Sequence, residues 1–410
     1  MIEAIDIDSQ LTSKEFIADP YPVYRALRGT DPVYYSKAWG VWVLTRYDDI
    51  VPILRDPQHF SNSGRFAALL DQLPADVQQE MAPLRQHYSA GMIQADPPDH
   101  TRLRALVRDA FSARVIQNIR PHVQAIVDDL IDQFDKKGQV DIIRNLAYPL
   151  PVIVISELLG VPVEDRDRFL IWSHDLTGLQ ATGGANADYA RRAARAVQEL
   201  EEYFRQICAE RRRSPRNDLI SQMIAAQESG DKLSEDELIN MCVTFLIAGH
   251  ETTNSLIGNG ILTLINHPSE LEELSRDPSL MATAVEEILR YESPIQRAWR
   301  RVTEDVEVGG RQIRAGELVF LMLGSANRDP SQFPDPDRFD IRRSDNQHVA
   351  FGYGVHFCIG APLARVEAPI AIGTVLRRLR NLRLEQPVEW YGSIHVRGPN
   401  SLHLAFESES

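Results

Sequence analysis

Periodic and alternating apolar positions divide the chain into helix-rich and strand-rich stretches. From about 98 to 292 the pattern is mostly helical, and VIQNIRPHVQAIVDDLIDQF at 115–134 is a long amphipathic stretch. Residues 30–50 and 301–323 carry runs of β-branched and aromatic residues that favour short strands. Within the second run, Gly309-Gly310 indicates a hairpin turn. A proline-rich segment, NRDPSQFPDPDRFDIRR, then precedes a last helix and short strands.

One helical stretch is apolar all round. Ser234 and Glu237 form a capping box, which predicts a helix start at about residue 235. The following LINMCVTFLIAG has no polar face, so the pattern predicts a buried helix.

Polar residues then enter this buried helix in the run from Ala248 to Thr253, AGHETT. A carboxylate and hydroxyls inside a fully buried helix are costly unless they have partners or a function. Gly249 weakens the helix, and the hydroxyl of Thr252 can bond back to the carbonyl of Ala248. We expect a local kink there, with a groove that admits dioxygen and water. Contacts of Glu251 and its neighbours with another helix are the alternative.

A second helix, SLMATAVEEILRY, ends before a Ser-Pro pair. Glu287 and Arg290 lie three residues apart on it and can pair. They point almost opposite to the apolar face, so periodicity alone favours a solvated surface pair.

Composition narrows the class of protein. Hydrophobic residues make up 43% and charged residues 25% of the 410, as in ordinary globular proteins. The net charge of −14 argues against nucleic acid as a partner. Three irregularly spaced cysteines predict no disulfide framework and fit a reducing cytoplasm. The acidic N-terminus lacks the features of a signal peptide, and no apolar run is long enough to cross a membrane.

No internal repeat, low-complexity tract or flexible linker interrupts the sequence. We therefore expect one domain over residues 1–410. Its α-rich part would span about 98–292 and 358–382. Its β-rich parts would span about 30–50, 301–323 and 383–405.

The segment 351–365, FGYGVHFCIGAPLAR, carries the most specific chemistry. Gly352, Gly354 and Gly360 surround Cys358, and an apolar, helix-favouring run follows. The glycines permit a tight loop, which places the sulfur at the N-terminal end of a helix. Free N–H groups and the helix dipole there favour the thiolate. A thiolate in such a loop suits a soft metal or a haem iron, and a free cysteine in a turn is the alternative.

This loop resembles the haem-ligand loop of cytochrome P450 enzymes. The matching residues are Phe351, Gly352, Gly354, His356, Cys358, Gly360, Ala364 and Arg365. The resemblance runs from roughly residue 15 to 405. It implies a mainly α fold with small β-sheets, the triangular prism of that family. It also implies haem b (iron protoporphyrin IX) with Cys358 as the iron ligand and Phe351 packed against the sulfur.

Haem carries two propionates, which need cationic or hydrogen-bonding partners. His100 and Arg104 lie at i and i+4 on one helical face, although an ordinary surface pair is the alternative. The resemblance implies that Arg300 and His356 complete the propionate ligands, with Arg301 as the alternative to Arg300. It also places Ala248 and Gly249 at the cofactor.

The resemblance assigns roles to the polar residues of both helices. Glu251 and Thr252 match the acid–alcohol pair that delivers protons during dioxygen activation. Glu287 and Arg290 match a buried pair beneath the proline-rich segment, with Arg338 completing a charged triad. We follow the resemblance over the periodicity here and expect this triad to be structural, holding the cysteine loop in register.

The substrate pocket follows from the family's variable segments, which by position are about 61–95, 170–195, 239–248, 294–299 and 392–400. Its expected lining is apolar and includes Val243, Leu246, Ile247 and Ile295. Arg297 is the exception. It either binds a substrate carboxylate or points outward, and the second interpretation is favoured.

Together these features predict a monooxygenase that inserts one atom of O2 into an apolar small molecule, by hydroxylation or epoxidation. A loop-level analogy points weakly to secondary metabolites such as polyketides. Electrons would come from a separate ferredoxin or flavodoxin and its reductase, in the cytoplasm, with neither nucleic acid nor membrane as a partner.

Two alternatives remain open. One is a haem-thiolate enzyme that uses peroxide or works without O2, against which the Glu251–Thr252 pair argues, because such an enzyme needs no proton relay. The other is a non-catalytic haem or metal-binding sensor or carrier. His356 and Cys358 lack the second ligand pair that a zinc site needs.

Overall fold

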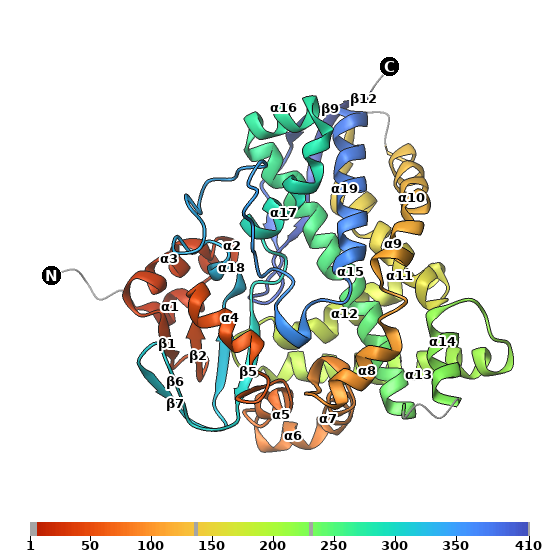
Figure 1. The fold of residues 1–410 in the computed structure, drawn as a ribbon. Helices are drawn as coiled ribbons and strands as arrows, with labels where there is room; N and C mark the ends of the chain where they lie inside the picture. Colours follow the sequence, from red (N-terminus) through yellow and green to blue (C-terminus); the bar gives the residue numbers. More distant parts are fainter. Residues whose placement is uncertain (1–5, 135–137, 229–232, 409–410) are drawn as a thin grey trace.

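The computed structural model describes residues 6–134, 138–228 and 233–408 (Figure 1). Its α-helices are α1 Ile7–Leu11, α2 Lys14–Ala18, α3 Tyr21–Thr30, α4 Tyr47–Arg55, α5 Arg65–Leu70, α6 Ala75–Glu80, α7 Ala82–Ser89, α8 Asp99–Val107, α9 Ala113–Asn118, α10 Arg120–Asp132, α11 Pro149–Leu159, α12 Arg166–Thr177, α13 Ala187–Arg213, α14 Leu219–Glu228, α15 Glu235–Asn266, α16 Pro268–Arg276, α17 Met281–Tyr291, α18 Leu323–Ala326 and α19 Ala361–Arg378. Short helices α1 to α7 thus occupy much of the region before residue 98.

Within these described residues, the strands form four small sheets. They are β1 Val33–Ser36, β2 Val41–Leu44, β3 Phe60–Ser61, β4 Gln139–Asp141, β5 Ala298–Val302, β6 Val306–Val308, β7 Arg311–Ile313, β8 Leu318–Leu321, β9 Leu379–Leu384, β10 Glu389–Trp390, β11 Pro399–Ser401 and β12 His403–Ser408. The largest sheet has the order β1-β2-β8-β5-β3, and only its β2–β8 pairing is parallel. The predicted hairpin is confirmed, because Gly309 and Gly310 turn between β6 and β7 with φ of +55° and +77°.

Helix α15 runs through the middle of the molecule, beside α19 (Figure 1). Both bonds of the predicted capping box are present, since Ser234 Oγ accepts from the N–H of Glu237 and Glu237 accepts from the N–H of Ser234. A Cβ on Gly249 would lie 2.7 Å from a side-chain carbon of Ile155, so this glycine lets α15 approach α11 closely. Neither α15 nor any other helix in the described ranges is suited in length and apolarity to spanning a bilayer.

The amphipathic stretch 115–134 is divided between two helices. Helix α9 ends at Asn118, and α10 begins at Arg120 with Pro121 in its first turn. Proline lacks the N–H that a continuous helix would need at this position, so the chain restarts there. Val123, Val127 and Ile131 still share one buried face of α10, as the periodicity predicts.

Glu287 and Arg290 form a fully buried pair, with both side chains 0% exposed and two hydrogen bonds of 2.7 Å between them. The prediction that Arg338 completes the triad is wrong. Its side chain is 67% exposed and lies beside Asp340, and only its backbone carbonyl accepts a hydrogen bond from Arg290. Arg343 takes the place instead, with its Nε 3.2 Å from Glu287. The proline-rich segment, residues 327–343, turns between Arg338 and Arg343 and directs only the side chain of Arg343 inward.

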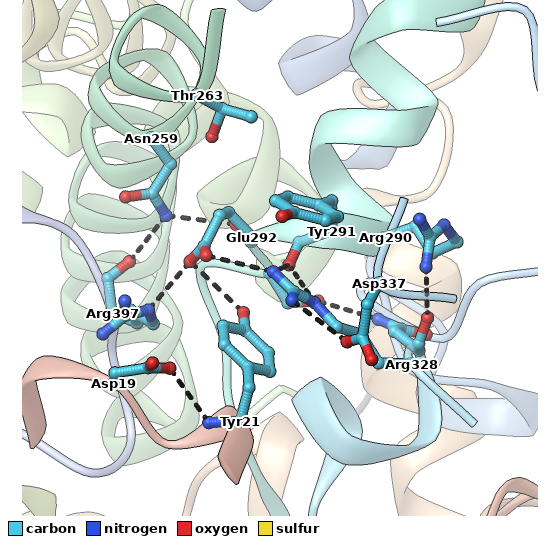
Figure 2. Close-up of polar contacts among 12 residues, drawn as sticks. Asp19, Tyr21, Asn259, Thr263, Arg290, Tyr291, Glu292, Arg328, Asp337 and Arg397 are labelled. Atoms are coloured by element: carbon cyan, nitrogen blue, oxygen red, sulfur yellow. Dashed lines mark hydrogen bonds and ion pairs between the residues drawn. The ribbon is translucent and has the colours of Figure 1, made fainter. Parts of the chain in front are cut away.

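A second buried network, centred on Glu292, joins segments that are far apart in sequence (Figure 2). The carboxylate of Glu292 accepts hydrogen bonds from Tyr21 (3.2 Å), Arg328 (3.2 Å) and Arg397 (2.8 Å). The guanidinium of Arg328 lies 3.6 Å from the ring centroids of both Tyr21 and Tyr291. The network therefore ties the N-terminal α3, the end of α17, the segment after α18 and the C-terminal region to one another.

Candidate functional site

The loop before α19 presents the sulfur of Cys358 at the start of that helix. Gly352 and Gly354 have φ of +71° and +70°, a region that L side chains rarely adopt. A Cβ on Gly354 would also lie 2.5 Å from the carbonyl oxygen of Leu54 on α4. The N–H of Cys358 donates to the carbonyl of Phe351 across 2.9 Å, which closes the loop. The backbone geometry thus explains why glycines occupy these positions.

The thiol of Cys358 keeps accessible surface, yet enough protein surrounds it that burial raises its pKa. The backbone N–H groups of Gly360 and Ala361 hydrogen-bond the sulfur, and Arg104 and Arg365 lie near enough for their charges to act on it. All four oppose the effect of burial because they favour the thiolate. These groups stabilise negative charge on the sulfur, as expected of a thiolate that ligates a metal.

A cluster of cationic and imidazole groups lies next to this loop. It is formed by Arg65 (α5), His100 and Arg104 (α8), Arg300 (β5) and His356 (in a 3-10 turn, Gly354–His356). The rings of His100 and His356 have centroids 4.1 Å apart. Burial, followed by the nearby groups His100, Arg300, Arg65 and Arg104, lowers the pKa of His356 to about 2.

The cluster fits the two carboxylates of a haem. Burial lowers the pKa of Arg65 to about 9 and that of Arg300 to about 10, and neither forms an ion pair with a carboxylate of the described residues. Nε2 of His356 and Nε of Arg65 are buried with no hydrogen-bond partner there. Buried donors without acceptors are costly, so an anionic group from outside the chain is the natural complement. The propionates of a haem would supply that group.

Arg65 was missed by the sequence analysis. It lies in a short helix far from the other cationic residues in sequence, and no local spacing marks it. Arg300 is buried and Arg301 is only partly so, which favours Arg300 as the cationic residue of β5 in this cluster.

In the central part of α15, one face keeps accessible surface while most of the other residues are buried. Its residues recur at helical spacing and are Thr244, Ile247, Ala248, Glu251 and Thr252. Ala248 is the most open of them, in the middle of a helix whose other faces pack on α11, α13 and α19. A small residue on an open face leaves room for a flat ligand to approach the helix. Gly249 instead faces α11.

Two of the expected pocket residues face away from this side. Val243 and Leu246 are 1% and 0% exposed and pack in the core, so their assignment to the pocket lining is wrong. Each directly precedes a residue of the open face, Thr244 or Ile247, and one step along a helix turns the side chain toward another side. Ile247 and Ile295 keep accessible surface, and Ile295 pairs with Val396 in a β-bridge.

Glu251 and Thr252 are both on the open face. Oε1 of Glu251 accepts from the hydroxyl of Thr177 on α12 at 3.1 Å, and burial raises the pKa of Glu251 to about 7. The hydroxyl of Thr252 donates to the carbonyl of Ala248 at 3.0 Å, as predicted, while α15 remains helical through this position. A carboxyl that titrates near neutrality beside a hydroxyl is suited to transferring protons.

The favoured interpretation of Arg297 as an outward-pointing side chain is wrong. The residue is 3% exposed, and its guanidinium lies 4.1 Å from the ring centroid of Phe320.

Within the described ranges, no group of three or more His, Cys, Asp or Glu side chains could hold a metal ion. The zinc alternative therefore has no ligand set there.

Comparison with known proteins gives one family. The family model for cytochrome P450 matches residues 66–390. The vitamin D(3) 25-hydroxylase of Pseudonocardia autotrophica is 43% identical over 88% of this chain and 87% of its own length. The polyketide biosynthesis cytochrome P450 PksS of Bacillus subtilis (strain 168) is 38% identical over 96% and 97%. The crystal structure of myxobacterial cytochrome P450 CYP267B1 in complex with myristic acid superposes with a TM-score of 0.88 at 42% identity, covering 98% of this chain and 99% of its own.

Proposed function

The chain belongs to the cytochrome P450 family, whose enzymes carry haem b, and on that premise we propose that it hydroxylates or epoxidises a largely apolar small molecule with one oxygen atom from O2. The proposal extends to its electron source, a separate ferredoxin or flavodoxin with its reductase.

One observation carries the proposal. Glu251 and Thr252 lie together on the open face of α15, and the carboxyl of Glu251 has a pKa of about 7. A peroxide-using enzyme has no need of such a pair, because peroxide already brings the protons that O2 lacks. The pair therefore favours use of O2 over use of peroxide.

The cofactor is held by residues at two places. Cys358 would provide the sulfur ligand, and the backbone N–H groups of Gly360 and Ala361 hydrogen-bond that sulfur. Arg65, His100, Arg104, Arg300 and His356 would hold the propionates. When bound, the haem iron supplies the redox chemistry that activates dioxygen, with the thiolate donating electron density to it. The protein contributes position, charge neutralisation and proton control.

Proton transfer falls to three side chains. Thr177 donates a hydrogen bond to Oε1 of Glu251, which fixes the carboxyl on the side of α15 that faces α12. At neutral pH the carboxyl is divided between its acid and its base form, so it can take a proton and release it again. Thr252 uses its own hydrogen for the carbonyl of Ala248, which leaves the oxygen free to accept a hydrogen bond from the open face.

The substrate class rests on apolar lining and on relatives. Ile247, Ala248 and Ile295 present apolar surface on the accessible side. The relatives named above act in polyketide biosynthesis or on vitamin D(3), and one structural neighbour holds myristic acid. We therefore assign a bacterial secondary metabolite, or a lipid-like molecule of similar size, to this chain.

The first experiment uses the purified holoprotein, reduced with dithionite and exposed to carbon monoxide. We expect the long-wavelength Soret band of a thiolate-ligated haem in the difference spectrum. A haem spectrum without that band would refute ligation by Cys358. Turnover of a panel of apolar substrates with a ferredoxin, its reductase and NADPH should then exceed turnover with hydrogen peroxide. The reverse order would overturn the use of O2.

A further inference from the structure

Arg297 is a buried cation outside the propionate cluster. It is 3% exposed, and burial lowers its pKa to about 9. No carboxylate of residues 6–134, 138–228 and 233–408 forms an ion pair with it. The titratable groups that face it are Tyr24, whose pKa is raised by burial, and His395, whose pKa is lowered to about 3, so both are neutral at pH 7. A buried charge without a counter-charge is costly, which indicates that a partner is supplied from outside the chain.

The donors of Arg297 are only partly used. Nη2 donates to two backbone carbonyls, that of Gln180 at 2.8 Å and that of Thr182 at 3.1 Å. Nε and Nη1 are buried and have no hydrogen-bond partner among the described residues. The central carbon of the guanidinium lies over the ring of Phe320, 4.1 Å from its centroid. Its orientation is therefore fixed while part of its hydrogen-bonding capacity stays unmet.

The position of Arg297 connects it to the substrate pocket. Three of the variable segments expected to line that pocket meet here, namely 170–195, 294–299 and 392–400. The N–H of Ile394 donates to the carbonyl of Ala181 at 3.0 Å, and the N–H of Gln296 donates to the carbonyl of His395 at 2.9 Å. From segment 294–299, Arg297 donates to two carbonyls of segment 170–195. It also lies beside His395 of segment 392–400.

We propose that Arg297 binds the carboxylate of an amphiphilic acid, so that the substrate of the enzyme proposed above is an apolar chain or ring system with one carboxylate. The acid takes the place of the carbonyls of Gln180 and Thr182 on Nη2 and engages one of the two unpartnered N–H groups. Charge-assisted hydrogen bonds are roughly twice as strong as those to neutral carbonyls, and the guanidinium fork matches a carboxylate. The exchange also gives the buried cation its missing counter-charge.

The test compares tetradecanoic acid with its methyl ester, which has the same chain and no charge. Dissociation constants come from the spin-state shift of the haem in the holoprotein. We expect the acid to bind about tenfold more tightly than the ester in the unmodified protein. Arg297→Met should remove this preference by weakening acid binding, with ester binding changed less than about twofold. Arg297→Lys, which keeps the charge and loses the fork, should fall between them.

Arg314→Met, at an exposed arginine directly after β7, is the matched control and should keep the preference. Equal binding of acid and ester by the unmodified protein would overturn the proposal, and this comparison needs no variant. A preference that survives Arg297→Met would overturn it as well. Neither outcome touches the proposed monooxygenase function, which the carbon monoxide spectrum and turnover of a neutral substrate test separately.

Discussion

The hydroxyl of Thr177 on α12 donates a hydrogen bond to Oε1 of Glu251 on α15, across 3.1 Å. This contact joins two helices that are 74 positions apart at these residues. Burial raises the pKa of the Glu251 carboxyl to about 7, and the bond from Thr177 opposes that rise because it favours the carboxylate. A hydrogen bond from another helix therefore limits how far burial raises the pKa of Glu251.

Removing this contact should move the pH dependence of turnover. Thr177→Val takes away a donor to the carboxylate, so the pKa of Glu251 rises and the inflection near pH 7 in the yield of product per electron moves to higher pH. Glu251→Gln cannot titrate and should remove the inflection. Product and NADPH consumption measured from pH 5.5 to 9 check both outcomes. An unchanged inflection in Glu251→Gln would assign it to another group.

The raised pKa of Glu251 should also make the free energy of unfolding depend on pH. Its pKa is about 4.5 in the unfolded chain and about 7 in the folded one, so between these values the unfolded state binds fewer protons. The free energy of unfolding should therefore fall by about 3 kcal/mol as the pH rises from 4.5 to 7 and level off above that. Denaturation of Glu251→Gln and of the unmodified protein at pH 5 and pH 8 isolates this difference. Equal pH responses would contradict the raised pKa.

Thr252 should control coupling rather than binding. Thr252→Ala removes the hydroxyl on the open face, so we expect about tenfold less product per NADPH, with the lost electrons recovered as hydrogen peroxide. Thr244→Ala, two turns earlier on the same face, is the matched control and should leave coupling close to normal. Unchanged coupling in Thr252→Ala would refute the proton-delivery role.

Local signals predicted the central features well. The capping box of Ser234 and Glu237 fixed the start of α15, and the apolar run after it placed the helix in the core. The glycines around Cys358 marked a tight loop, in which Gly352 and Gly354 have positive φ and Gly360 does not. Each of these features depends on residues only a few positions apart, which is why the sequence alone contains them.

Features that depend on distant contacts were harder to predict. Arg338 and Arg343 are five residues apart in the proline-rich segment and carry the same guanidinium group. Only the path of the folded chain decides that Arg343 reaches Glu287. Arg65 has no motif around it, and its role is visible only once β5 and the cysteine loop are packed against α5. Arg297 was assigned to the surface because a lone arginine usually lies there.

Arg65 should be needed for cofactor retention. Its Nε is buried without a partner, and its charge lies near His356 and Arg300. Arg65→Met should speed haem transfer to apomyoglobin about tenfold, since a charge-assisted bond to a propionate is lost. Arg301→Met, on the partly exposed neighbour of Arg300, is the control and should transfer haem at the normal rate. Equal rates for Arg65→Met and the unmodified protein would remove Arg65 from the propionate cluster.

The buried pair Glu287–Arg290, below the proline-rich segment, should be essential to stability. Arg290→Met leaves Glu287 as a buried carboxylate with one cation, Arg343, and two neutral donors beside it, and we expect a loss of about 3–5 kcal/mol in the free energy of unfolding. Arg338→Met removes an exposed side chain and should change stability by less than about 0.5 kcal/mol. Denaturant unfolding of the holoproteins measures both. A large loss in Arg338→Met with none in Arg343→Met would restore the sequence-based triad.

The network around Glu292 should fasten the N-terminal helices to the body of the protein (Figure 2). Glu292→Gln leaves Arg328 and Arg397 without their shared carboxylate, although Arg328 keeps a longer contact with Asp337 at 3.5 Å. We expect a loss of about 3 kcal/mol in the free energy of unfolding.

Glu272→Gln is the control for this prediction, because its pairing with Arg276 is exposed on α16 and surface pairs contribute little. Hydrogen exchange should locate the effect of Glu292→Gln in α3, where Tyr21 loses its charged acceptor and the ordered guanidinium of Arg328. Exchange that rises only near α17 would mean that the network stabilises its own turn and does not hold the N-terminal helices. Exchange that rises in both places, with Glu272→Gln unchanged, is the result that the geometry predicts.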